Sequence, residues 1–135
     1  MTRIRIVPMD ESSESNFMAI AATLIEIMQN NIGERVSKRQ GKPNEVEFLG
    51  PPIPFLKGKE LWFGAVRVGK RYVSYHLMPI YVFTDLLENL SPELKKRMQG
   101  KSCFNFTRVD EALFRELGEL TRIGYERFQK GGMFG

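Results

Sequence analysis

The segment ELWFGAVRVGKRYVSYHLM, residues 60–78, constrains the fold most, because its residues suit strands on both sides of a central glycine. β-Branched and aromatic residues alternate here with small or polar ones, which predicts strands over 61–68 and 71–78. Gly69 and Lys70 lie between them, and a glycine in the first position favours a two-residue type II′ turn. The segment is therefore expected to form an antiparallel hairpin.

The turn decides which side chains of the hairpin share a face. A two-residue turn pairs Val66 with Val73 and Trp62 with Leu77, and these residues form an apolar face suited to packing against helices. The opposite face is mixed in character, and it is expected to carry Phe63, Arg67, Tyr72, Ser74 and His76. These five residues are the predicted ligand-binding set, because a sheet covered on one face leaves the other to solvent, a ligand or another subunit.

The remaining elements are predicted by periodicity and by capping residues. They are a helix over 13–31, a short strand over 46–49, short helices over 84–90 and from Pro92, a strand over 102–106, a helix over about 110–129 and a mobile tail over 130–135. The expected fold is α+β, with an antiparallel sheet built on the central hairpin and the strand over 102–106, and with helices packed on one face.

Composition limits the class of protein. The chain has 135 residues, 42% hydrophobic and 27% charged, which fits one globular domain over 1–135. No apolar stretch approaches the length of a membrane span, no signal segment is apparent, and the single cysteine excludes an intramolecular disulfide, so a cytoplasmic location without a membrane partner is expected. The net charge of +4 is spread among acidic residues, so nucleic acid is not an expected partner.

Few residues could carry chemistry. One histidine, His76, and one cysteine, Cys103, cannot form a zinc site of the usual Cys/His kind. They could act together as a nucleophile and its base, although the sequence alone does not show that they meet. Most carboxylates of the last helix lie three or four residues from Arg or Lys, which is typical of a solvated helix face. We therefore predict no catalytic residues and no metal ligands.

From LWFGAVRVGKRYVSYHLMP through LSPELKKRMQGKSCFNF to the final helix, roughly residues 46–128, the chain resembles the YdhG-like family, a bacterial family of domains of unknown function. The first helix fits the resemblance more loosely. The resemblance implies a small α+β domain with an antiparallel sheet. Some members are described as frataxin-like iron chaperones, so it also implies iron as a candidate cargo. No family metal ligand matches a numbered position of this chain.

Three functional hypotheses follow. The leading hypothesis is a non-enzymatic domain that binds a small molecule or a protein partner on the open sheet face, with a second copy of the chain as one candidate partner. The first alternative is an iron chaperone, which depends on the family resemblance. The second alternative is an enzyme that uses His76 or Cys103. No cofactor is predicted, and iron enters only through the resemblance.

Overall fold

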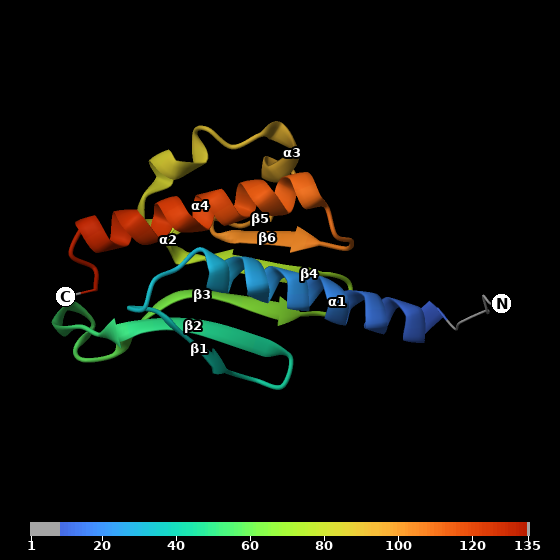
Figure 1. The fold of residues 1–135 in the computed structure, drawn as a ribbon, viewed down its shortest axis with the longest axis horizontal. Helices are drawn as coiled ribbons and strands as arrows, with labels where there is room; N and C mark the ends of the chain where they lie inside the picture. The colour runs from blue at the N-terminus through green and yellow to red at the C-terminus, as the bar shows by residue number, and fades with distance from the viewer. Residues whose placement is uncertain (1–8, 135) are drawn as a thin grey trace.

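A computed structural model describes residues 9–134 of the chain (Figure 1). Its elements are α1 Met9–Asn30, β1 Ser37–Gln40, β2 Glu45–Pro52, β3 Glu60–Val68, β4 Val73–Leu77, α2 Met78–Val82, α3 Pro92–Lys95, β5 Met98–Gln99, β6 Cys103–Phe106 and α4 Glu111–Lys130, with 3-10 helices at Pro54–Leu56 and Thr84–Leu87. The described strands form one antiparallel sheet in the order β1-β2-β3-β4-β6-β5. The α+β class is thereby confirmed.

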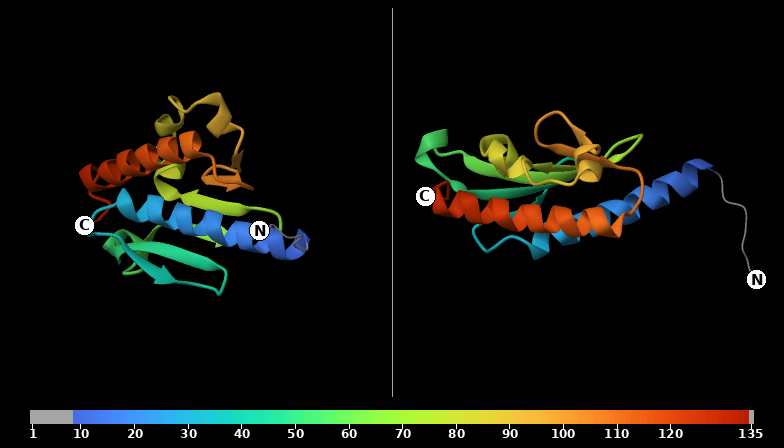
Figure 2. Two further views of the ribbon diagram at one scale, coloured as in Figure 1. Left: turned by 45° about the vertical axis from the view of Figure 1, so that its right-hand side comes forward. Right: turned by 90° about the horizontal axis from the view of Figure 1, so that it is seen from above.

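The helices α1 and α4 cover one face of the sheet, and this arrangement defines the covered and the open face (Figure 2). Val73, Tyr75 and Leu77 of β4 point toward the helices and are fully buried. The Tyr75 hydroxyl lies 2.5 Å from the hydroxyl of Thr121 on α4, so its polar atom has a partner in the core. Ser74 and His76 alternate with these three residues in β4, so they face away from the helices.

The hairpin forms, but its register differs by two residues from the predicted one. Val68 pairs with Val73 and Val66 pairs with Tyr75, so the connection has four residues rather than two. Gly69 does not take a positive φ, and its N–H instead donates to the carbonyl of Tyr72 at 2.9 Å. The predicted register would place Arg71 on the apolar face opposite Val68, whereas the longer loop leaves Arg71 exposed at its tip. A shift of two residues keeps the side-chain alternation, so most face assignments survive.

Phe63 and Trp62 are exceptions, and their predicted positions were wrong. Phe48 of β2 pairs with Gly64, but the next residue, Leu49, pairs with Trp62, so Phe63 is the extra residue of a β-bulge. The alternation inverts at this bulge. Phe63 is fully buried on the helix face, against Tyr125 and Phe128 of α4, and therefore does not belong to the open face. Trp62 lies on the open face, where its ring is 5.9 Å from the ring of His76.

Among the strands and α-helices, three elements, β1, α2 and β5, were not predicted, because the helix expected to run from Pro92 to Gly100 ends at Lys95, whereas two predicted helix caps are confirmed. The Ser91 hydroxyl accepts a hydrogen bond from the Leu94 N–H at the start of α3, and the Asp110 carboxylate accepts one from the Leu113 N–H at the start of α4. The tail was predicted to be mobile, and this prediction was wrong for Phe134. Phe134 is only 3% exposed, and its ring packs on the rings of Tyr125 and Phe128.

Candidate binding site on the open sheet face

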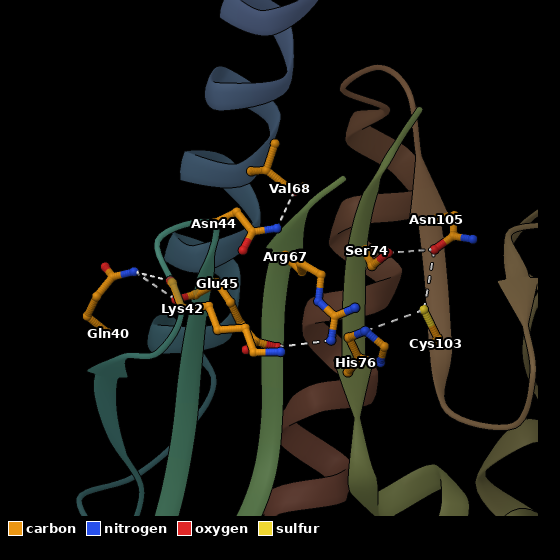
Figure 3. Close-up of polar contacts among 10 residues, drawn as sticks. All are labelled: Gln40, Lys42, Asn44, Glu45, Arg67, Val68, Ser74, His76, Cys103 and Asn105. Carbon is orange, nitrogen blue, oxygen red and sulfur yellow. Dashed lines mark hydrogen bonds and ion pairs between the residues drawn. The ribbon is translucent and has the colours of Figure 1, made fainter. Parts of the chain in front are cut away.

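Cross-strand pairing brings the polar residues of the open face together. Ser74 of β4 lies between Arg67 of β3 and Asn105 of β6, and each of these neighbours is its paired residue. Two residues further along β4, His76 is paired with Cys103 of β6. Because paired residues of adjacent strands point to the same side, these five side chains lie on the face away from the helices, as Figure 3 shows.

Hydrogen bonds join these side chains into a network. The Ser74 hydroxyl donates to the Asn105 amide oxygen at 3.0 Å, and the Cys103 thiol donates to the same oxygen at 3.3 Å. The Cys103 sulfur lies 3.8 Å from His76 Nε2 (Figure 3). Arg67 is held from the other side by the Glu45 carboxylate at 3.3 Å. The network fixes the orientation of these polar groups.

These side chains surround a hollow of about 440 Å³, which we call the polar hollow. It is lined by Arg67, Gly69, Lys70, Arg71, Tyr72, Ser74, His76, Gln99, Cys103 and Asn105. The lining holds three basic residues and no acidic one, and the carboxylate of Glu45, which lies outside the lining, pairs with Arg67. The basic residues outnumber this one carboxylate, so the hollow is electropositive. Its size lies within the range of small-molecule sites.

Four of the five residues predicted as ligand-binding, Arg67, Tyr72, Ser74 and His76, line the polar hollow, and only Phe63 does not. The prediction missed the three residues contributed by β5 and β6, which are Gln99, Cys103 and Asn105. The alternation of Cys103 and Asn105 in SCFNF places both on one face. However, which strand pairs with β6 cannot be seen from one sequence, because that contact is remote along the chain.

Burial keeps the histidine and the cysteine in their neutral forms. The pKa of His76 is lowered from its ordinary value, first by burial and then by the positive charge of Arg67, against an opposing effect of Glu45. The pKa of the Cys103 thiol is raised by burial, which outweighs the opposing effects of Ser74 and Arg67. Near neutral pH the pair is therefore an imidazole facing a thiol, rather than an imidazolium facing a thiolate.

A second hollow adjoins the polar one at the end of the sheet where β3 begins. This apolar hollow, of about 540 Å³, is lined by Ile53, Leu56, Lys57, Lys59, Glu60, Leu61, Trp62, Met78, Tyr81, Val82 and Met133. Tyr81 and Val82 are 54% and 43% exposed, so this hollow presents apolar side chains to solvent. Trp62 forms part of its wall and also contacts His76 in the polar hollow.

Among the side chains that the structure describes, no three of His, Cys, Asp or Glu gather closely enough to hold a metal ion. The described helices are also too short or too polar to cross a membrane.

Comparisons with models of known protein families, with curated proteins and with solved structures gave no match to this chain. Membership of the YdhG-like family, which the hairpin and the SPELKKRMQGKSCFNF block suggested, therefore stays a proposal.

Proposed function

We propose that the protein is a binding domain for a small anionic molecule, which it holds in the polar hollow without transforming it chemically. The observation that supports this most directly is the lining of the hollow, with three basic residues and no carboxylate. A guanidinium can hold a carboxylate or a phosphate with two parallel hydrogen bonds, and Arg67 is fixed in place by Glu45. His76 and the second amide hydrogen of Asn105 add uncharged donors that would orient the anion, whereas the Ser74 hydroxyl already donates to Asn105.

The state of the His76–Cys103 pair favours binding over nucleophilic catalysis. The raised pKa of Cys103 leaves little of the reactive thiolate at neutral pH. A catalytic histidine is usually held in one tautomer by a partner on its second nitrogen. Among the described residues, the His76 ring contacts the Cys103 sulfur through Nε2, and no group hydrogen-bonds to Nδ1.

Nuclear magnetic resonance titration tests the proposal. Acetate, phosphate and sulfate are added separately to ¹⁵N-labelled protein, and the shifted amide signals are mapped on the sequence. The shifts are expected to cluster at Arg71, Ser74, His76 and Asn105. Shifts that instead follow basic residues everywhere, including Lys95 to Arg97, would show that only general charge attraction is present.

A pair of matched variants makes the test specific. Arg67→Gln removes a guanidinium from the polar hollow, whereas Arg39→Gln removes one of similar exposure, 55% against 48%, that pairs with Glu60. Both variants lower the net charge by one, and Arg39 does not line the polar hollow. Arg67→Gln should weaken anion binding about tenfold, which is the loss expected for a hydrogen bond to a charged group. Arg39→Gln should leave binding unchanged, and an equal loss in both variants would refute the proposed site.

A further inference from the structure

One pair of side chains in contact links the linings of the polar and apolar hollows. His76 lines the polar hollow and Trp62 lines the apolar one, and their ring centroids are 5.9 Å apart. The β-bulge at Phe63 creates this contact, because it turns Trp62 onto the open face next to His76. Gly64 lets the strands approach closely at the same place, since a Cβ there would clash with the His76 carbonyl oxygen and with Met28.

The two hollows have opposite chemistry. The polar hollow is rich in hydrogen-bonding groups and basic side chains. The walls of the other hollow are mainly aliphatic and aromatic, with its charged residues confined to Lys57, Lys59 and Glu60. Apolar side chains left exposed beside an electropositive hollow are poorly suited to water but well suited to the hydrocarbon part of a ligand.

We infer that the ligand is an amphipathic anion, whose carboxylate or phosphate head group lies in the polar hollow and whose apolar chain passes Trp62 into the apolar hollow. This inference depends on the proposed anion binding and adds the chemical class of the ligand. The ligand is a free monomer rather than a lipid within a membrane, because both hollows are of small-molecule size and the uncharged donors His76 and Asn105 are half-buried.

Straight-chain carboxylates from acetate to decanoate, and the matching alkyl phosphates, provide the test. All are used below their critical micelle concentrations, and affinity is measured by isothermal titration calorimetry. The fluorescence of Trp62, the only tryptophan, provides a second readout. In at least one series the affinity should rise about fourfold for each added methylene that becomes buried, which corresponds to about 0.8 kcal/mol per methylene. Octanol, which lacks the charge, should bind at least tenfold more weakly than the anion of equal chain length.

Two valines of nearly equal exposure provide matched variants. Val82 lines the apolar hollow and is 43% exposed, whereas Val109 lies outside it and is 44% exposed. Val82→Asp places a carboxylate beside the chain of the ligand, so it should abolish most of the gain with chain length while acetate or phosphate binds as before. Val109→Asp should retain the full dependence on chain length. Arg67→Gln should weaken the binding of every chain length by a similar factor.

The outcomes separate this inference from the proposed function. Anion binding without any dependence on chain length would overturn the inference and leave the proposed function standing. A dependence on chain length that persists in Val82→Asp would place the chain elsewhere and would also overturn the inference. Equal binding of octanol and octanoate, or no binding in either series, would overturn both. Co-sedimentation of the protein with vesicles of anionic phospholipid, without binding of monomeric ligand, would contradict the free-ligand assignment.

Discussion

At the scale of single residues, His76 and Trp62 form a built-in optical probe. Each is the only residue of its type in the chain, and their rings are 5.9 Å apart. A protonated imidazole quenches an excited indole more strongly than a neutral one does. Trp62 fluorescence should therefore fall on acidification, with a midpoint below 6.5 because the pKa of His76 is lowered. A fluorescence titration of the wild type and of His76→Gln checks this, and a midpoint above 6.5 would contradict the burial of the ring.

The lowered pKa of His76 also links folding stability to pH. Between the pKa of the folded state and the unfolded value of 6.5, the unfolded chain binds more protons at this residue, so stability rises with pH. The contribution is complete above about pH 6.5 and is lost as pH falls toward the folded pKa. Urea unfolding of the wild type and His76→Gln at several pH values isolates this contribution. The difference in free energy between them should change across that window and remain constant from pH 7 to 8.

Cys103 is expected to react slowly with alkylating reagents, because burial raises the pKa of its thiol. The rate with iodoacetamide at pH 7 should be at least several-fold below that of a free cysteine in a peptide, since the thiolate is the reactive form. The rate should increase as pH rises beyond 9. Faster reaction than the peptide at pH 7 would show an activated thiolate and would favour the enzyme hypothesis over simple binding.

At the scale of elements, the sequence predicted the open face because that prediction needed only side-chain alternation. The two-residue error in the hairpin loop left Arg67, Ser74 and His76 on the face predicted for them. The bulge could not be foreseen in the same way. Phe63 and Trp62 are both aromatic, so either suits the core by composition. The choice is made by the pairing of β2 with β3, which involves residues remote from the hairpin.

The bulge predicts different costs for truncating two neighbouring aromatic residues. Phe63→Ala should destabilise the protein by about 3–5 kcal/mol, because it leaves a cavity beneath α4. Trp62→Ala removes a half-buried ring from the open face and should cost less than about 2 kcal/mol. Chemical denaturation measures both values. The reverse order of the two losses would show that Trp62, rather than Phe63, faces the helices.

The meeting of His76 and Cys103 also lay beyond sequence reasoning. The sequence offers them as a possible nucleophile and its base, but 27 positions separate them along the chain. Their contact depends on β4 pairing with β6, although β5 lies between these strands in the chain. The alternation within each strand could be predicted, whereas the choice of neighbour depends on how the intervening short helices return the chain to the sheet.

At the scale of the whole molecule, the C-terminal segment closes the core. Phe134 lies against the rings of Tyr125 and Phe128. The Arg35 guanidinium lies over the Phe134 ring, 5.8 Å from the centre of that ring. Phe134→Ala should therefore lower the free energy of unfolding by about 3 kcal/mol, as expected for a buried phenylalanine. Phe134→Leu, which retains apolar volume, should restore most of that loss. A change below about 0.5 kcal/mol in Phe134→Ala, measured by urea unfolding, would restore the original expectation of a mobile tail.

The two outer strands of the sheet affect how copies of the chain meet. All four residues of β1 are exposed, and Lys38 and Arg39 are among them. β5 at the opposite edge has only two residues. Short edge strands and positive charge discourage another chain from extending a sheet by main-chain hydrogen bonds. The sheet is thus protected against open-ended aggregation at both edges. A homodimer, if it forms, is expected to associate through side chains of a face rather than through a continuous intermolecular sheet.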